Sequence, residues 1–243
     1  MNALQFALNQ ALDREALSRS FQEEKRLHIP DFLAPECAEQ LLAFLTRSED
    51  WTLVMNQGDK LLELDRWIRA DISAAKQVQI DEAIYAAARQ GFQFRYENIR
   101  VKAEGDDGTS LTTPLVAFAQ FLNSDEALSF FRDVTGFDDI SFADTRATAY
   151  GPGHFLTSHD DDAHGQSRRI AYVYNLTKQW NHDWGGLLTF PETASSRATA
   201  FVPAFNATNL FAVPRQHSVS FVTPFANARR YSVTGWLHAG PRP

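Results

Sequence analysis

The hydrophobic and polar positions divide the chain into an N-terminal part with mixed patterns and a C-terminal part rich in short strands. In the N-terminal part, Leu4, Leu8 and Leu12 recur every four residues, which predicts an amphipathic helix. A second helix is expected to begin at Pro35, because proline is favoured in the first turn. Further patterns predict helices over residues 81–90 and from about 124 to 136, strands over 26–32 and 92–101, and a polar loop over 102–110.

From Ile140 onward, short runs of β-branched and aromatic residues are separated by Gly, Pro, Asn and Asp. This spacing predicts an antiparallel sandwich, jelly roll or barrel. The runs cover residues 145–150, 169–176, 187–190, 209–213, 217–223 and 230–237. Because no Pro- or Ser-rich linker separates the two parts, we expect one domain over residues 1–243. In it, residues 1–140 form a helical and strand support, and residues 141–243 form the β core.

Composition narrows the class of protein. Of the 243 residues, 44% are hydrophobic and 12% aromatic, which is enough for a substantial core. The net charge of -7 and the pI of about 5.5 argue against general nucleic-acid binding. No apolar run reaches the ~18 residues of a membrane span, and the N-terminus does not resemble a signal peptide, so we expect a cytoplasmic protein. The single cysteine, Cys37, excludes an internal disulfide and a thiolate-only metal site.

Candidate metal ligands lie at the start of the strand-rich part. If His159 begins an extended segment, its side chain and that of Asp161 point to the same face, and both can reach one cation. A 2-His-1-carboxylate site for non-haem Fe(II) needs this pair and one more histidine, for which His217 is the best candidate. Taken alone, a His-x-Asp pair is more often an acidic turn. The other five histidines lack a partner at matching spacing, and we interpret them as structural or surface residues: His28, His154, His164, His182 and His238.

A candidate anion site follows His217. Arg230 opens a strand-like run, and a buried guanidinium can pair with both oxygens of a carboxylate. Ser232 lies two residues further, on the same strand face, where its hydroxyl can donate to that carboxylate. In isolation, Arg230 is more simply explained as one partner of a surface ion pair. Gly185 and Gly186 form a turn that allows a close backbone approach or an ordinary hairpin.

Taken in their order along the chain, these motifs resemble those of a known protein family. They are Tyr150…Gly153…Leu156…His159-x-Asp161, Gly185-Gly186-Leu187, His217-Ser-Val and Arg230-Tyr-Ser-Val-Thr-Gly-Trp236. The set resembles the Fe(II)/2-oxoglutarate-dependent dioxygenases, and within them the prolyl 4-hydroxylase-like group, which includes oxygen-sensing and ribosomal-protein prolyl hydroxylases. The resemblance covers about residues 140–238.

The resemblance implies a fold and a set of site residues. The fold would be a double-stranded β-helix (jelly roll), mainly β with supporting N-terminal helices packed on one sheet. His159, Asp161 and His217 would hold Fe(II), with no catalytic residue beyond this metal centre. 2-Oxoglutarate would bind through Arg230, with Tyr150 and Ser232 nearby. O₂ would be the second cosubstrate, and ascorbate would support turnover.

One position departs from the family pattern. Where oxygen-sensing prolyl hydroxylases have a tyrosine in the strand after His-x-Asp, this chain has Asn175. Tyr174 could replace that tyrosine only if the register shifts by one, which would also move its side chain to the other face. The sequence therefore leaves open which of Tyr172, Tyr174 and Asn175 contacts the cosubstrate, with core packing favoured for the tyrosines.

The resemblance implies hydroxylation of an unactivated C–H bond, with release of succinate and CO₂. The favoured substrate is a prolyl residue in a protein or peptide. The alternatives are a free amino acid or small biosynthetic intermediate and, in another class, a non-catalytic metal- or ligand-binding jelly roll. Arg168 and Trp184 are candidate substrate contacts, although a solvated surface charge and a hairpin residue are competing interpretations.

Overall fold

The computed structural model describes residues 5–102, 113–162, 167–192 and 195–241 of the chain. The helices in these ranges are α1 (Arg14–Glu24), α2 (Pro35–Arg47), α3 (Arg66–Ala70), α4 (Ala74–Ala88), α5 (Pro114–Leu122), α6 (Asp125–Thr135) and a 3₁₀ turn at His182–Trp184. The strands are β1 (Arg26–Ile29), β2 (Thr52–Gln57), β3 (Lys60–Leu64), β4 (Phe94–Arg100), β5 (Ile140–Ala143), β6 (Arg146–Tyr150), β7 (Phe155–His159), β8 (Arg168–Leu176), β9 (Leu188–Pro191), β10 (Ala198–Phe201), β11 (Phe205–Ala212), β12 (His217–Val219) and β13 (Arg230–Ala239).

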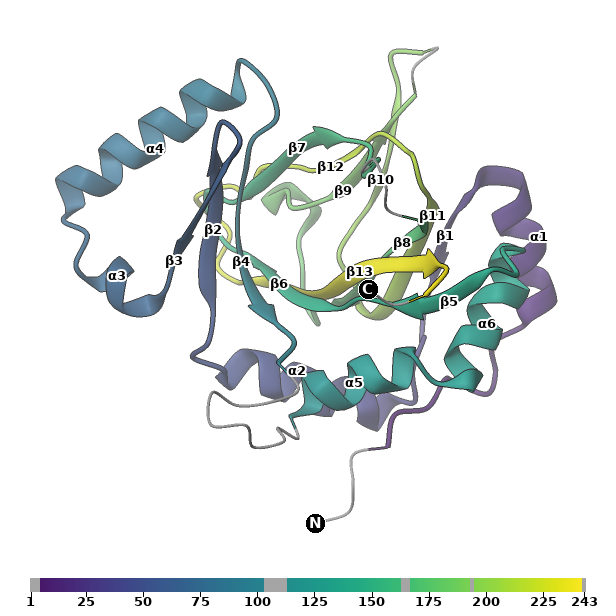
Figure 1. Ribbon diagram of the computed structural model, residues 1–243. Helices are drawn as coiled ribbons and strands as arrows, with labels where there is room; N and C mark the ends of the chain where they lie inside the picture. The colour runs from purple at the N-terminus through teal and green to yellow at the C-terminus, as the bar shows by residue number, and fades with distance from the viewer. Residues whose placement is uncertain (1–4, 103–112, 163–166, 193–194, 242–243) are drawn as a thin grey trace.

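The strands form one antiparallel sheet that curls into a nearly closed barrel (Figure 1). Its order is β1-β11-β8-β13-β6-β4-β7-β12-β9-β10, while β2 pairs with β3 and β4, and β5 pairs with β13. The predicted jelly-roll class with supporting helices is therefore confirmed. The topology places β13 between β8 and β6 and pairs β7 with β12, so segments far apart in the sequence line one interior.

Four helices, α1, α2, α5 and α6, cover one outer face of this sheet (Figure 1). Their contact with the sheet is the main hydrophobic core, in which Phe118, Phe130 and Phe131 are almost completely buried. Tyr174 of β8 joins this core and stacks on Phe118 with the ring centroids 5.3 Å apart. Aromatic pairs of this kind supply large buried apolar areas, so this face stabilises the barrel from outside.

Helix boundaries follow local capping chemistry. The Ser124 hydroxyl accepts a hydrogen bond from the backbone N–H of Ala127, and Gly136 ends α6 in a left-handed conformation, as the sequence predicts. α2 begins at Pro35, also as predicted. The predicted helix over 81–90 is present as α4, but it begins earlier, because Ser73 caps the N–H of Lys76.

The predicted helix over residues 4–12 is wrong, since the described residues 5–12 contain no helix. Leu8 instead makes an isolated β-bridge with Leu33, so its apolar side chain is buried by a strand-like contact. α1 begins only at Arg14, where the Asp13 carboxylate accepts from the N–H of Ala16. The predicted loop over 102–110 falls mostly outside the described residues.

A hairpin and two helices flank the barrel beside β4. β2 and β3 form this hairpin, which the sequence patterns did not predict, and β2 also pairs with β4. Ile84 of α4 packs with Leu53, Met55 and Phe155, which fixes α4 against β2 and β7. β4 therefore lies between the hairpin and the barrel, since one of its edges pairs with β2 and the other with β6 and β7. Within the described residues, none of the helices combines the length and apolar composition needed to cross a bilayer.

Candidate metal and cosubstrate site

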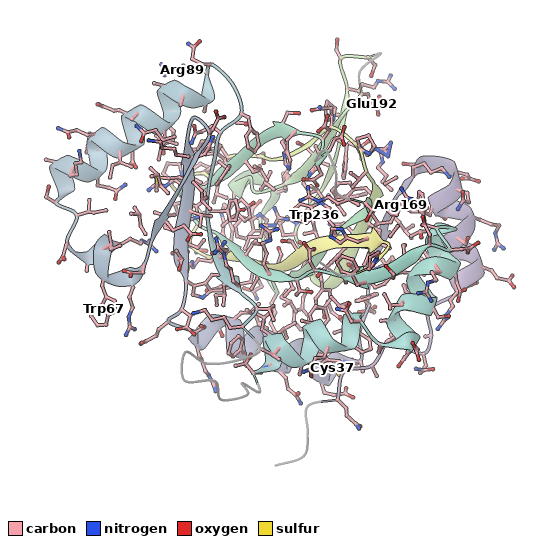
Figure 2. The ribbon with its side chains drawn as sticks, in the orientation of Figure 1. Cys37, Trp67, Arg89, Arg169, Glu192 and Trp236 are labelled. Carbon is pink, nitrogen blue, oxygen red and sulfur yellow. The ribbon has the colours of Figure 1, made fainter. Side chains whose placement is uncertain are left out.

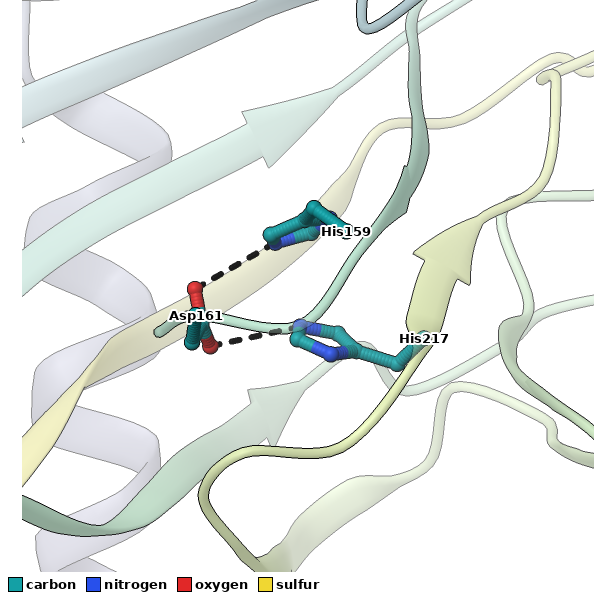
Figure 3. Close-up of side chains that lie close together, drawn as sticks. All are labelled: His159, Asp161 and His217. Atoms are coloured by element: carbon teal, nitrogen blue, oxygen red, sulfur yellow. Dashed lines mark ion pairs between the residues drawn. The ribbon is translucent and has the colours of Figure 1, made fainter. Parts of the chain in front are cut away.

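The structure brings His159, Asp161 and His217 together inside one end of the barrel (Figure 3). His159 at the end of β7 and His217 at the start of β12 are direct partners in the antiparallel pairing. Asp161 lies between the two imidazoles. Its Oδ1 is 3.4 Å from Nε2 of His159, and its Oδ2 is 3.4 Å from Nε2 of His217.

Asp161 reaches this position by a route that differs from the expected one. The strand ends at His159 instead of beginning there, and Asp161 has a left-handed backbone with φ of 62°. Alternation along an extended strand therefore does not explain the cluster. Aspartate tolerates this conformation better than most residues. The Arg168 guanidinium holds the bend by donating to the backbone carbonyl of Asp161 at 3.0 Å.

Backbone carbonyls orient both imidazoles. Nδ1 of His159 lies 3.0 Å from the carbonyl oxygen of Thr157, and Nδ1 of His217 lies 2.8 Å from that of Arg215. Since a carbonyl oxygen only accepts, each Nδ1 must carry the proton. In the neutral imidazole, Nε2 then presents its lone pair toward Asp161, which is the arrangement of a metal-ligating histidine.

The charge states of the cluster favour cation binding. Burial, reinforced by the adjacent His159, lowers the pKa of His217 to about 4, so its imidazole is neutral at physiological pH. Burial raises the pKa of Asp161, but the hydrogen bond with His159 and the charges of His217 and His159 outweigh it. The pKa of Asp161 therefore lies below its ordinary value, so the site offers an ionised carboxylate beside the neutral imidazole of His217.

This donor set fits Fe(II). The three ligand atoms lie within 4.8 Å of one another, close enough for a single ion to contact all of them. Two imidazoles and one carboxylate from one side are the facial triad of non-haem iron sites, which leaves coordination positions open on the other side. Among the described residues, this is the one such cluster.

Arg230 lies deeper in the same interior and is almost completely buried. It donates a hydrogen bond of 2.7 Å to the carbonyl oxygen of Gly186, while its Nε has no protein partner. Burial lowers the pKa of Arg230 to about 10, which keeps it charged at neutral pH. No carboxylate of the described residues pairs with it, so the guanidinium fits an anionic ligand from outside the protein.

A row of buried polar side chains accompanies Arg230. Ser232 of β13 lies directly opposite Thr148 of β6 on one side and Asn175 of β8 on the other. Each of the three has an oxygen without a hydrogen-bond partner: Ser232 Oγ, Thr148 Oγ1 and Asn175 Oδ1. Tyr150 pairs with Arg230 across the strands, so it shares this inner face, and burial raises its pKa. Sequence reasoning missed Thr148, although its position two residues before Tyr150 places it on the same face.

The strand register shows on which face of β8 each of the three candidate residues lies. Asn175 faces the row beside Arg230, whereas Tyr172 and Tyr174 point to the opposite face and join the helix-covered core. The Tyr174 hydroxyl donates to Asn206 at 2.8 Å, and that of Tyr172 donates to the backbone carbonyl of Asp144 at 2.8 Å. Both tyrosine hydroxyls are thus satisfied in the core, as their predicted packing role requires.

The cluster and Arg230 line one cavity of about 220 Å³. Arg168, a candidate substrate contact, is in its wall, with its guanidinium carbon 3.6 Å from the ring centroid of Trp236 (labelled in Figure 2). Trp184, the other candidate, is not part of this wall among the described residues. It packs edge-on against Trp180 with the ring centroids 5.3 Å apart.

The remaining histidines have other surroundings. Nδ1 of His154 accepts a hydrogen bond from the N–H of Gly151, which fixes the turn before β7. His28 contacts Asn209, His238 stacks on Phe142, and His182 is exposed. His164 lies outside the described residues.

Comparison with known proteins confirms the resemblance that the motifs indicate. Residues 145–238 match the family model of the 2OG-Fe(II) oxygenase superfamily. This range contains the three clustered residues, Arg230, Tyr150 and Ser232. A 157-residue region, 62% of the chain, is 26% identical to the prolyl 3-hydroxylase OGFOD1 of Mus musculus. The chain spans 28% of the length of that relative.

Solved structures show the same fold. A prolyl-4-hydroxylase from Pseudomonas putida superposes with a TM-score of 0.57 and 17% identity, covering 94% of this chain and all of that one. A prolyl hydroxylase from Trichoplax adhaerens, solved with a hypoxia inducible factor oxygen degradation domain peptide fragment, gives a TM-score of 0.60 at 16% identity. The superposition covers 93% of this chain and 89% of the Trichoplax chain.

Proposed function

We propose that this chain, whose motifs, family model and fold all correspond to the prolyl-hydroxylase-like 2OG-Fe(II) oxygenases, is an Fe(II)- and 2-oxoglutarate-dependent enzyme that hydroxylates a prolyl residue in a protein or peptide. The observation that carries the proposal is the pairing, in one cavity, of a facial His-Asp-His cluster with a buried arginine that has no carboxylate partner.

Each group has a distinct role in the proposed site. His159, Asp161 and His217 would hold Fe(II). Arg230 would bind the distal carboxylate of 2-oxoglutarate, with hydroxyls from Ser232 and Thr148 beside it. When bound, Fe(II), 2-oxoglutarate and O₂ supply an oxidative decarboxylation that inserts one oxygen atom into a C–H bond and releases succinate and CO₂. The protein's contribution is to orient the cosubstrate, keep the site dry and hold the substrate carbon close to the metal.

The nature of the relatives supports a protein or peptide substrate, since the three named above are prolyl hydroxylases and one of them was solved with a peptide. We also propose a cytoplasmic location.

The test is turnover by purified protein with Fe(II), 2-oxoglutarate, ascorbate and air, supplied with a proteome digest from the source cells. We expect succinate formation, and peptides whose mass increases by one oxygen atom at proline. His159→Ala and His217→Ala should abolish both, while the exposed His182→Ala serves as a matched control and should keep them. If oxygen is incorporated into free amino acids but not into peptides, the substrate is a small molecule and the proposed peptide substrate is wrong. An absence of Fe(II)-dependent succinate with every substrate would refute the enzyme assignment.

A further inference from the structure

A groove outside the metal cavity is built to hold a ligand of its own. It has a volume of about 750 Å³ and lies between the β2–β3 hairpin, β4 and the start of β6. Four residues line both the groove and the metal cavity: Phe92, Phe94, Tyr96 and Arg146. A ligand lying in the groove is therefore next to the metal site. The ring of Phe92 is 5.4 Å from that of His159.

The walls of the groove are apolar and exposed. On the hairpin side, Leu61 is 51% exposed, and opposite it Phe92 is 50% exposed. Phe94 and Tyr96 continue the wall inward, because alternate residues of β4 face the same side. The other face of β4 is occupied, since Glu97 forms ion pairs with Arg69 and Arg229. Large apolar side chains exposed along a groove are typical of a binding site.

The inner end of the groove is cationic. Arg146 lies directly opposite Arg100 in the β6–β4 pairing, and like charges in that position destabilise a sheet unless an anion is near. Arg100 pairs with Glu63. Arg146 makes no ion pair within the described parts of the chain. Its guanidinium lies over the ring of Trp236, 4.8 Å from the ring centroid.

The acidic groups around Arg146 are engaged elsewhere. The carboxylate of Asp144 accepts a hydrogen bond of 2.6 Å from the backbone N–H of Trp236 and faces His238 at 3.6 Å. Asp59 lies at the hairpin turn, at the outer part of the groove. Arg168, on Trp236 as well, adds a second guanidinium close to the first. Arg146 is therefore an arginine of the groove without an ion-pair partner among the described residues, whereas Arg100 pairs with Glu63.

We infer that the groove binds an extended polypeptide segment and that Arg146 selects an acidic side chain close to the residue being hydroxylated. This inference rests on the proposed function and names its substrate class. Apolar side chains of the segment would cover Leu61 and Phe92, and a Glu or Asp carboxylate would pair with Arg146. A groove of this volume exceeds what a free amino acid needs, which favours a polypeptide as the source of the carboxylate.

The test measures binding rather than turnover, so that it is independent of the hydroxylation chemistry. Two matched pools of short, fluorescently labelled proline-centred peptides, one with Glu and one with Gln at the flanking positions, are titrated into Fe(II)- and 2-oxoglutarate-loaded protein under nitrogen. We expect the Glu pool to bind about tenfold more tightly than the Gln pool. Arg146→Gln should reduce this preference to about twofold or less, while Arg146→Lys should keep part of it.

The matched control is Arg89→Gln, which removes the same charge at the C-terminal end of α4 (Figure 2), from a residue that does not line the groove, and should leave the preference unchanged. Equal binding of the two pools, no binding of either, or an unchanged preference in Arg146→Gln would overturn the inference. If free N-acetylglutamate competes as strongly as unlabelled peptides of the Glu pool, the carboxylate that Arg146 binds comes from a small molecule. That result would overturn the proposal that the groove binds a polypeptide. If peptides bind with the expected preference but are never hydroxylated, the proposed function fails while the groove assignment stands.

Discussion

The guanidinium of Arg230 donates a hydrogen bond of 2.7 Å to the carbonyl oxygen of Gly186, 44 positions earlier in the chain. This contact links β13 to the turn that leads into β9. The turn can present its carbonyl in this direction because Gly185 and Gly186 both have positive φ values, of 71° and 63°. The glycine pair that first looked like an ordinary hairpin therefore positions the arginine proposed to bind the cosubstrate.

Replacing Gly185 should damage this arrangement. A Cβ at Gly185 would lie 2.0 Å from the carbonyl oxygen of Phe221, and the backbone conformation already disfavours any side chain. We expect Gly185→Ala to lower the free energy of unfolding by about 2 kcal/mol or more and to weaken 2-oxoglutarate binding. Thermal denaturation and titration of 2-oxoglutarate measure the two effects. Gly91→Ala is the control, because a Cβ there meets nothing within 4 Å; equal behaviour of the two variants would contradict the prediction.

Arg230 should limit the stability of the ligand-free protein. It is a buried charge without a carboxylate partner, and an apolar side chain of similar length avoids its desolvation cost. We expect Arg230→Met to melt at the same temperature as the wild type, or higher, without 2-oxoglutarate. The wild type should gain about 2.7 kcal/mol at a ligand concentration of 100 Kd, and the variant should gain nothing. A variant that melts lower but still responds to 2-oxoglutarate would refute this account.

Thr148 and Thr177 offer a matched comparison of buried hydroxyls. Among the residues that the structure describes, the hydroxyl of Thr148 has no hydrogen-bond partner, whereas that of Thr177 accepts from the N–H of Tyr231 at 3.0 Å. Thr148→Val should therefore leave the stability of the ligand-free protein unchanged or slightly raised, while Thr177→Val should cost about 1–3 kcal/mol. Only Thr148→Val should weaken 2-oxoglutarate binding. Denaturant unfolding and ligand titration on both variants check this, and similar stability losses in the two would show that Thr148 is satisfied by another group.

Acid should destabilise the protein through His154. Burial, and then the charge of Arg95, lowers the pKa of His154 from 6.5 to about 4 in the folded state. Above pH 6.5 both states are neutral and the stability is fully present. As the pH falls from 6.5 toward 4, the unfolded state takes up a proton that the folded state refuses, so stability is lost at up to about 1.4 kcal/mol per pH unit.

Denaturant unfolding between pH 7.5 and 4.5 measures this effect. His154→Gln should reduce the slope, and the exposed His182→Gln should not. His217 keeps part of the slope, because burial lowers its pKa as well. Identical slopes in wild type and His154→Gln would contradict the assignment.

The sequence patterns predicted most of the strand-rich part, because each strand there combines a β-branched or aromatic run with a clear turn. They failed where tertiary contacts decide the structure. Leu4, Leu8 and Leu12 have helical spacing, yet the bridge between Leu8 and Leu33 and the cap at Asp13 move the helix downstream. The β2–β3 hairpin lacks the alternation of buried and exposed positions that indicates a strand, because four consecutive residues of β2 are buried and β3 is mostly exposed.

The candidate site shows the same division. The identity of His159, Asp161 and His217 followed from ordered motifs, but the strand geometry assumed for them was wrong. A positive φ at Asp161 depends on contacts such as that with Arg168, which lies outside the motif. Thr148 and Asn175 became visible as neighbours of Ser232 only through strand register, which a single sequence does not specify.

The direct pairing of His159 with His217 also makes any bound ion a cross-link. The two strands that carry them are joined elsewhere by the contact of Ser158 with Gln216, 58 positions apart. An ion held by both imidazoles would close a loop of that length in the folded protein alone, so it would stabilise the fold by its binding free energy, which is lost when the ligands separate on unfolding. Metal occupancy would then determine the stability of the folded state as well as the chemistry of the site. The single cysteine of this protein cannot provide an internal disulfide in its place.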